Sequence, residues 1–344
     1  MAVGPTMASA PELRVVVLHD TVDPAAGPDV QDTLVQASAV RDALARLGCE
    51  VDTLAVHADA RSAGGRITAL RPKLVFNLVE STVGFAHTVD GVPRLLDELG
   101  IPYTGCPAAA LRQTSDKLAA KRHMTRHGLP TPAVWRGESD GRWIGKSVWE
   151  HASLGMDDGC VVAGHEVEAL LRERRRCWGG DWFAEAYVEG REINVSLLEI
   201  DEAPRVLAVA EIDFIDYAAD KPRIVGYSAK WLQDSFEYVN TPRCFLDDDS
   251  HPTLRHGVIE LALQCWARFG LRGYARVDLR VDRRDRPWLL DVNANPCLSP
   301  DAGFAAALEH AGIAYDAAVA HIVTRARCGR RDSKRPAALS AARR

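Results

Sequence analysis

Four polar residues near the C-terminal end of the sequence have the types and spacing of a cation-binding site. Two apolar-alternating runs flank a polar turn that contains Pro287, and this pattern predicts a β-hairpin. Side chains two positions apart on a strand share a face. Arg276 is therefore expected beside Asp278 on one strand, and Asp291 beside Asn293 on the other.

The register of this hairpin follows from its turn. If the turn is centred between Arg284 and Asp285, Asp278 faces Asp291, and the arginine likewise faces the asparagine. Directly opposed carboxylates repel each other in a sheet. A hard cation with oxygen ligands removes that repulsion, and Mg²⁺ held by carboxylates and phosphates is the natural candidate.

The alternative is that these acids are solvated on an exposed face. Leu289, Leu290 and Val292 surround Asp291 and indicate an interior strand instead. The pattern therefore favours a metal site.

Three lysines are suitably placed for phosphate binding. Lys117 lies at a predicted helix start, Lys146 ends a short predicted strand, and Lys230 lies in a Tyr-Ser-Ala-Lys-Trp segment. Taken singly, each is more typical of a surface lysine. The loop Glu150–Met156 contains small residues whose backbone N–H groups could also contact a phosphate.

A further segment could recognise a nucleoside. The strand that ends in Glu185–Val188 leads through a turn to Glu192. Such a segment can offer backbone groups and a carboxylate to an adenine edge, and Glu192 to ribose hydroxyls. An ordinary turn between strands would have the same local pattern.

The elements that must position these groups begin with a βαβ rhythm, which predicts a parallel, doubly wound sheet. No G-x-G-x-x-G follows the first strand, so a dinucleotide site of the usual kind is not indicated. We expect strands at 13–18, 51–56, 74–78, 143–146, 182–188, 192–199, 206–212, 272–281 and 288–292. We expect helices at 32–47, 91–99, 115–127, 166–175, 254–269 and 316–325.

Composition places the chain among globular proteins of two or three compact units, because its 344 residues are 47% apolar and 26% charged. It lacks the apolar run of ~20 residues that a membrane span needs. The first residues show no basic segment followed by an apolar core, so we expect no secretory signal. Eight scattered cysteines without a C-x-x-C pair fit reduced thiols in the cytoplasm.

The charge is unevenly distributed along the chain. The net charge is −5, although residues 325–344 alone carry +7. This basic tail could contact nucleic acid or an acidic membrane surface. We favour the alternative interpretation, a frayed and solvated terminus.

The order and spacing of these segments resemble the D-alanine–D-alanine ligase family of the ATP-grasp superfamily over residues 13–324. The matching segments are Val75–Asn77, Gly100–Gly105, Ser115–Lys117, Gly128–Pro132, Lys146 with Ser153–Gly155, Gly190–Glu192, Ala229–Lys230, Gly273–Asp278 and Leu290–Asn293.

The resemblance implies an α/β fold with a doubly wound N-terminal domain followed by a two-subdomain ATP-grasp fold. The implied units are an N-terminal domain (11–105), the ATP-grasp N-subdomain (106–185), its C-subdomain (186–325) and a basic disordered tail (326–344). Homodimers are common in the resembling family, so the resemblance allows one here.

The resemblance also implies the ligands of ATP and of Mg²⁺ or Mn²⁺. They are Lys117 and Lys146 for the α- and β-phosphates, Lys230 for the γ-phosphate, Glu185, Ala186 and Val188 for adenine, Glu192 for ribose, and Asp278, Asp291 and Asn293 for the metal.

The implied reaction joins a small carboxylate to a small amine. The carboxylate attacks the γ-phosphorus and becomes an acyl phosphate, which the amine then attacks. Arg276 would stabilise the oxyanion of the tetrahedral intermediate, with Lys230 and Ser153 as further catalytic residues. The loop 230–238 would close to exclude water.

The chain departs from the family where the first amino acid is held. The family's N-terminal glutamate has no clear match, so Asp32 and Glu80 are candidates to replace its charge. Cys297 replaces a glycine, and Ala302 falls where a serine meets the second substrate, close to Ser299. We therefore expect Glu80, Cys297 and Ser299 to contact substrate, and the substrate to be different or broader.

Three classes of function stay open at this point. The first is a D-alanine–D-alanine ligase-like enzyme, and a ligase for other amino acids or amino-acid-like acids is its nearest alternative. A non-catalytic ATP-binding module is the second, although ATP binding does not need an oxyanion arginine. Nucleic-acid binding through the tail is the third.

Overall fold

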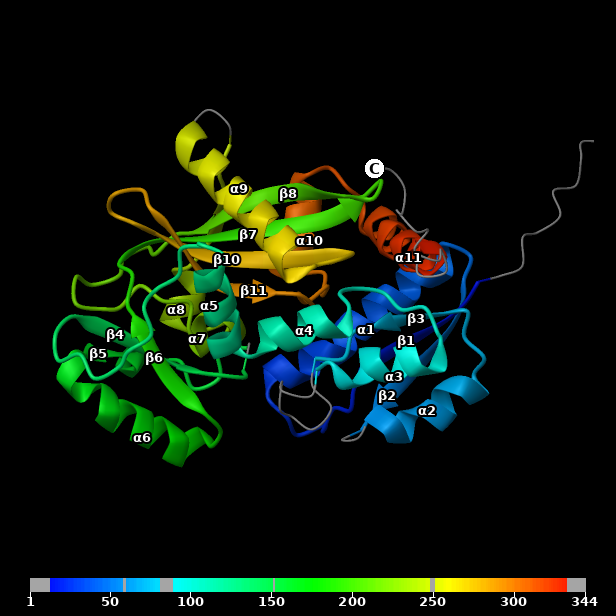
Figure 1. Ribbon diagram of the computed structural model, residues 1–344, viewed down its shortest axis with the longest axis horizontal. Coiled ribbons are helices and arrows are strands. Elements are labelled where there is room, and N and C mark those ends of the chain that lie inside the picture. The colour runs from blue at the N-terminus through cyan, green and yellow to red at the C-terminus, as the bar shows by residue number, and fades with distance from the viewer. Residues whose placement is uncertain (1–12, 58–59, 81–88, 151, 248–250, 333–344) are drawn as a thin grey trace, which may run out of the picture.

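Within the residues that the structure describes, the chain forms three β-sheets with helices around them. The computed structural model describes residues 13–57, 60–80, 89–150, 152–247 and 251–332. In Figure 1 the N-terminal sheet lies at one end, a small sheet lies at the other, and a five-stranded sheet lies between them.

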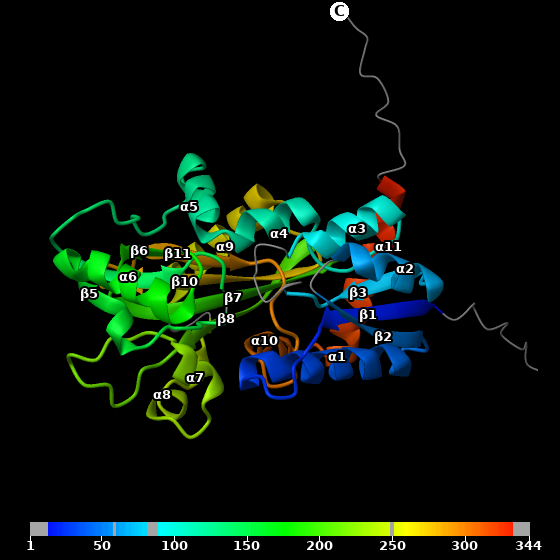
Figure 2. The ribbon, with the colours of Figure 1, turned by 90° about the horizontal axis from the view of Figure 1, so that it is seen from below.

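The N-terminal sheet is parallel, as predicted. Its strands are β1 (Arg14–Asp20), β2 (Glu50–Val56) and β3 (Leu74–Asn77), in the order β2-β1-β3. Helix α1 (Pro28–Arg46) covers one face, while α2 (Ala60–Ala69) and α3 (Gly91–Leu99) lie on the other (Figure 2). The sheet is therefore doubly wound. Helix α1 begins four residues before its predicted start, because Pro28 is well suited to the first turn of a helix.

The small sheet is antiparallel, with the order β5-β4-β6. Its strands are β4 (Arg142–Ser147), β5 (Val161–Ala163) and β6 (Trp182–Ala186), and α6 (Val167–Trp178) packs against it. Strand β6 ends two residues before the predicted end at Val188.

The five-stranded sheet is also antiparallel, with the order β11-β10-β7-β8-β9. Its strands are β7 (Gly190–Ile200), β8 (Ala203–Ile212), β9 (Arg243–Phe245), β10 (Tyr274–Asp282) and β11 (Pro287–Asn293). The face that bears Val195 and Val277 is apolar and packs against α4 (Ala108–Ser115), α5 (Lys117–Arg126) and α9 (Pro252–Phe269). The opposite face is polar along β7 and β10, and it carries the candidate site.

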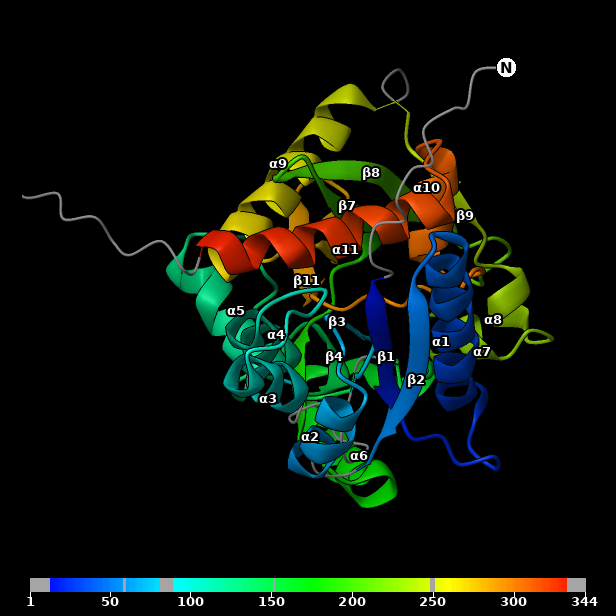
Figure 3. The same ribbon diagram turned by 90° about the vertical axis from the view of Figure 1, so that its right-hand side faces the viewer.

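Two C-terminal helices connect the N-terminal sheet with the five-stranded sheet. Helices α10 (Gly303–His310) and α11 (Tyr315–Asp332) join one hydrophobic core with α1, β1 and β3. Figure 3 shows α11 lying between the N-terminal sheet and the five-stranded sheet. Helix α11 continues beyond its predicted end at Arg325, so the predicted tail is helical as far as Asp332. Residues 333–344 lie outside the described residues.

The structure corrects two local predictions. The single helix expected over 115–127 is divided, because Asp116 has extended backbone and caps α5 by accepting a hydrogen bond from the N–H of Ala119 at 2.8 Å. Strand β11 is an edge strand rather than an interior one. Leu289 and Val292 are nevertheless buried, and the segment around Pro130 covers the edge of the strand, since the N–H of Leu289 donates to the Pro130 carbonyl at 2.8 Å.

Candidate active site

The hairpin of β10 and β11 has the predicted register. Asp278 stands opposite Asp291, and Arg276 stands opposite Asn293. The pairing shifts by one residue immediately after Asp278, toward the turn, so the irregularity leaves these pairs intact. Both aspartate side chains retain less than a fifth of their exposure, at 19% and 18%. The solvated alternative is therefore wrong.

Strand β7 extends the polar face beside the hairpin. Asn194 stands opposite Asp278 and donates from Nδ2 to its Oδ1 at 2.8 Å. Arg276 donates to the same carboxylate through Nε and Nη2, at 2.7 and 2.9 Å. Burial opposes the charge of Arg276, but the neighbouring Asp278 and Asp291 raise its pKa well above the usual value. This guanidinium therefore stays charged and fixed in direction.

The oxygen donors on this face fit a hard cation. Asp278 and Asp291 supply carboxylates across the hairpin, and Asn293 supplies an amide oxygen from the same strand as Asp291. Lys117 lies 3.7 Å from Asp291 and partly balances the negative charge. Such a set of few carboxylates that leaves room for phosphates suits Mg²⁺ or Mn²⁺.

A buried charge cluster joins the small sheet to α5. Glu185 is fully buried on β6 and accepts a hydrogen bond from Lys146 of β4 at 2.5 Å. Lys121 of α5 forms an ion pair with the other carboxylate oxygen. Burial alone would raise the pKa of Glu185, but Lys121 and Lys146 outweigh it and lower that pKa. Glu185 therefore stays ionised.

Lys121 was not predicted, although one signal could have identified it. It lies one helical turn after Lys117, so the two lysines share a face of α5. Lys117 itself donates to the Glu150 carbonyl at 2.5 Å. Burial lowers the pKa of Lys117 and of Lys121, although neighbouring acids oppose the shift. Three lysines and one carboxylate thus gather where phosphates were expected.

Arg280 connects the two segments that were predicted to hold the nucleoside. It donates to the Val188 carbonyl at 3.0 Å and to the Glu192 carboxylate at 2.9 Å. The turn from β6 to β7 is therefore fixed against the five-stranded sheet. The N–H of Ala186 donates to the Ala133 carbonyl at 2.8 Å, so this group is already used within the protein.

Lys230 lies on α7 (Tyr227–Trp231), within a segment that covers the polar face. Burial lowers its pKa to about 8, and repulsion from Arg276 acts in the same direction, while Asp278 and Glu192 oppose the shift. Lys230 is thus close to both Arg276 and the acids of the hairpin.

The covering segment is bound to the loop after Lys146. Ser153 has a left-handed backbone (φ +61°) and donates from Oγ to the Val225 carbonyl at 3.1 Å. Trp231 donates to the Ala152 carbonyl at 3.0 Å, and the N–H of Tyr227 to Met156 at 3.0 Å. The hydroxyl of Tyr227 also reaches Asp29 of α1 at 2.8 Å. The predicted small-residue loop and the predicted closing loop therefore meet; position 151 lies outside the described residues.

The predicted substrate residues converge at the start of α1. Cys297 donates from Sγ to one oxygen of Asp32 at 3.0 Å, and Ser299 donates from Oγ to the other at 2.7 Å. Asp32 therefore has fixed neighbours on the segment that follows β11.

Glu80 adds a second carboxylate to this group. Its backbone N–H donates to Asp20 at 2.7 Å, which places two further acids near Asp32. The Glu80 side chain is accessible to solvent, yet burial of its carboxyl group among protein atoms raises its pKa to about 7. Asp20 and Asp32 add to this shift, while Gln36 and Arg276 oppose it. Asp20 and Gln36 were not predicted, because they come from separate elements.

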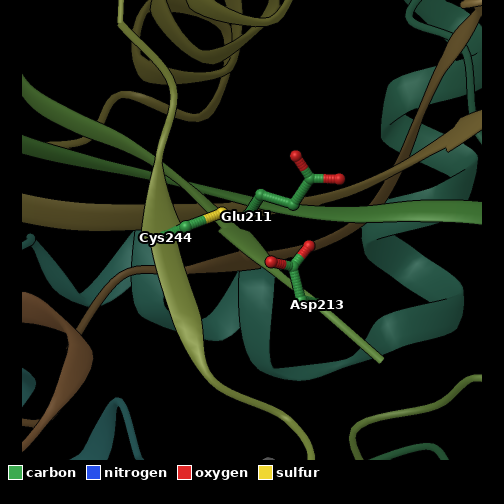
Figure 4. Close-up of side chains that lie close together, drawn as sticks. All are labelled: Glu211, Asp213 and Cys244. Carbon is green, nitrogen blue, oxygen red and sulfur yellow. The ribbon is translucent and has the colours of Figure 1, made fainter. Parts of the chain in front are cut away.

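A second acidic group lies on the same sheet and does not belong to this site. Glu211, Asp213 and Cys244 point toward one another between β8 and β9 (Figure 4). Arg191 binds both oxygens of Glu211, at 2.6 and 2.5 Å. The arginine already balances that charge, so the group is explained without a cation.

Comparison with known proteins agrees with this geometry. The family model described as the D-ala D-ala ligase C-terminus matches residues 144–324. A D-alanine–D-alanine ligase of Acidiphilium cryptum is 32% identical over 313 residues, which cover 86% of this chain and 94% of the relative.

Solved structures share the whole fold at low sequence identity. A D-alanine–D-alanine ligase from Bacillus anthracis, complexed with ATP, has a TM-score of 0.70 at 18% identity and covers 93% of this chain and 99% of its own. The VanG D-Ala:D-Ser ligase from Enterococcus faecalis has a TM-score of 0.66 at 15% identity, covering 92% and 99%.

The fold is an N-terminal α/β domain followed by an ATP-grasp fold, and the family match together with the curated relatives makes the protein an ATP-dependent ligase. The chain belongs to the D-alanine–D-alanine ligase family. Among the described residues, none of the helices combines the length and apolar character needed to cross a membrane.

Proposed function

We propose that this enzyme joins the carboxylate of one amino acid to the amino group of another, with D-alanine as the expected first substrate. The observation that carries the proposal is the shared face of Arg276, Asp278, Asp291 and Asn293, with Lys230 above it. A nucleotide-binding module needs the acids and lysines but has no use for a fixed arginine beside them.

The reaction proceeds by two displacements. A carboxylate oxygen of the first amino acid attacks the γ-phosphorus of ATP, and ADP leaves. The deprotonated amine of the second amino acid then attacks the acyl carbon, and phosphate leaves as the amide bond forms. Arg276 stabilises the oxyanion of that tetrahedral intermediate, and its fixed direction avoids reorganisation at the moment of reaction.

The protein's own cations bind and orient the nucleotide. Lys117 and Lys146 hold the α- and β-phosphates, and Lys230 holds the γ-phosphate from α7. Glu185 accepts a hydrogen bond from Lys146, which fixes this ammonium group beside the proposed phosphate site and leaves it two further N–H donors. Glu185 and the backbone at Ala186 and Val188 receive adenine.

Asp278, Asp291 and Asn293 hold Mg²⁺ or Mn²⁺, and Glu192 receives the ribose. Bound there, the metal neutralises charge that develops on the phosphates. Ser153 keeps the covering segment closed through Val225, which excludes water from the acyl phosphate.

The test is a pairwise amino-acid screen with ATP and Mg²⁺, in which ADP and the mass of the product are both measured. A dipeptide that appears in proportion to ADP is the expected result. Nucleotide binding without ADP formation across all D- and L-amino acids would contradict the proposal.

A second candidate is a ligase with a different or broader first substrate. The group of Asp20, Asp32 and Glu80 favours it, because Asp32 is oriented by Ser299 and by Cys297, and Cys297 stands where the resembling family has a glycine. Full turnover with D-alanine alone would remove this candidate. We also place the enzyme in the cytoplasm and propose a homodimer, which sedimentation of the purified protein would test.

A further inference from the structure

Arg243 lies on the same face of the five-stranded sheet as the active site. On β9 it stands opposite Ile212 of β8, which in turn stands opposite Glu192 of β7. Residues opposite each other in register share a face. Glu192 lies on the face of Arg276, because both belong to the alternate positions of β7 and β10 that face the site. Arg243 therefore projects toward the same space.

Contacts with α10 fix where this guanidinium lies. A β-carbon added to Gly303, the first residue of α10, would lie 3.3 Å from Nη2 of Arg243. Two residues along β9, Phe245 stacks on His310 of the same helix, with ring centroids 4.2 Å apart. Cys244 between them points to the opposite face, beside the acidic pair of Figure 4. The arginine thus lies over the start of α10.

Among the residues that the structure describes, Arg243 differs from its neighbouring arginines in having no acidic partner. Arg276 is paired with Asp278, and Arg280 with Glu192. In the part of the chain that the structure describes, no acidic side chain pairs with Arg243, whose side chain is exposed. Burial of part of the guanidinium and repulsion from Arg276 lower its pKa, so the like charges are close enough to interact.

The start of α10 adds to this positive potential. The N-cap residue of the helix is Ala302, whose side chain cannot accept a hydrogen bond from the first turn. The N–H groups of that turn therefore keep their positive partial charge beside the guanidinium. An arginine without an acidic partner among the described residues, together with uncapped N–H groups, favours an anionic ligand.

The reaction identifies which anion this is. This step rests on the proposed function. The carboxylate of the first amino acid is consumed at the γ-phosphate, next to Arg276 and Lys230. In a complex with two amino acids, the remaining anionic group is the carboxylate of the second one. We propose that Arg243 binds this carboxylate and so selects an amino acid, rather than an uncharged amine, as the second substrate.

A competition assay measures that selection directly. D-Alanine, ATP and Mg²⁺ generate the acyl phosphate, D-alanine and D-alaninamide compete for it, and the two products are quantified by mass. Arg243→Met is expected to lower the ratio of dipeptide to dipeptide amide by about 10- to 100-fold, the range for a lost hydrogen bond to a charged group. Arg243→Lys should retain part of the preference, because it keeps the charge but not the forked geometry.

Two controls separate an effect on binding of the second substrate from an effect on formation of the acyl phosphate. Hydroxylamine intercepts the acyl phosphate without presenting a carboxylate, so Arg243→Met should form hydroxamate within about twofold of the wild type. Arg205→Met removes an arginine that is 63% exposed on β8 and should leave the product ratio unchanged.

Each other outcome is decisive. An unchanged product ratio in Arg243→Met overturns the inference, and so does an equal loss of hydroxamate, which would place Arg243 at the first step. If the wild type releases no ADP with any acid, the proposed function itself fails, and this inference fails with it.

Discussion

The proposed nucleotide end and the proposed substrate end of the active site are built in different ways. At the nucleotide end, charged groups are close in sequence or face each other across neighbouring strands, as Asp278 and Asp291 do. At the substrate end, Asp20, Asp32 and Glu80 come from β1, α1 and the segment after β3, and Cys297 reaches them from beyond β11. The first arrangement depends on strand pairing, and the second on how separate parts pack together.

Charge balance also differs between the two ends. Glu185 is held between two lysines, and Asp278 accepts from an arginine and an amide. At the substrate end, Glu80 lies beside two further carboxylates, and its pKa rises to about 7. Where the charges of a site are balanced, the ligand-free state has little charge repulsion. An excess of negative charge instead favours binding of a cation. The substrate end is therefore suited to the ammonium group of an amino acid.

The largest effect is expected when one of the two opposed carboxylates is replaced by an amide. Asp291→Asn should lower kcat/KM about a thousandfold, because metal-assisted charge stabilisation supplies several kcal/mol to the transition state. Steady-state ADP release with saturating Mg²⁺ measures it. Asp285→Asn is the matched control, since Asp285 lies in the turn of the same hairpin at φ +56°, which asparagine also adopts. Equal losses in both variants would show that the hairpin matters only for folding.

This contrast explains which parts of the site were predictable from the sequence. The alternation of β10 and β11 and the position of their turn were sufficient to pair Asp278 with Asp291, because a hairpin is local. Parallel pairing in the N-terminal sheet also followed from the βαβ pattern. The edge position of β11 did not follow, since burial by the segment around Pro130 gives the same apolar pattern as an interior strand.

The remaining site residues depend on contacts that no local pattern encodes. Asp20 ends β1, and Gln36 lies inside α1, so neither stands in a motif. Arg243 belongs to a strand of three residues, which is too short to be recognised by alternation. Helix α10 was also missed, because its alanine-rich sequence lacks a clear capping signal at Ala302.

A loss of stability is expected when the charge balance around Glu185 is broken. Lys121→Met removes one of two cations from a carboxylate that is fully buried, which should lower the free energy of unfolding by about 3 kcal/mol. Urea unfolding of the ligand-free protein measures this. The double variant Lys121→Met with Glu185→Gln should recover part of the loss, while the exposed control Lys73→Met should change stability by less than about 0.5 kcal/mol. If Lys73→Met lowered the free energy of unfolding as much as Lys121→Met, the loss could not be attributed to the buried charge of Glu185.

The two ends should also respond differently to pH. Because the folded protein raises the pKa of Glu80 from 4.5 to about 7, its neutral form stabilises the empty enzyme at low pH, and that stability is lost as pH rises through 7. An ammonium group binds the ionised form, so KM for the first amino acid should fall several-fold between pH 6 and pH 7.5.

The control for this pH effect is Glu80→Gln, which should remove the change in KM. KM for ATP should stay nearly constant in the same interval, because Lys230, whose pKa is about 8, remains mostly protonated. If KM for ATP and KM for the first amino acid changed with pH in the same way, the effect could not be assigned to Glu80 alone.

The smallest effect is expected at the thiol that orients Asp32. Cys297→Ala removes a hydrogen bond of 3.0 Å, so Asp32 should turn more freely and KM for the first amino acid should rise about two- to fivefold with little change in kcat. Cys297→Ser keeps a donor at this position and should stay close to the wild type. KM for ATP should be unaffected in both variants, because the thiol contacts Asp32 and Ser299 and not the lysines proposed to bind the phosphates. A rise in KM for ATP that equals the rise for the amino acid would instead indicate that the segment after β11 couples the two ends.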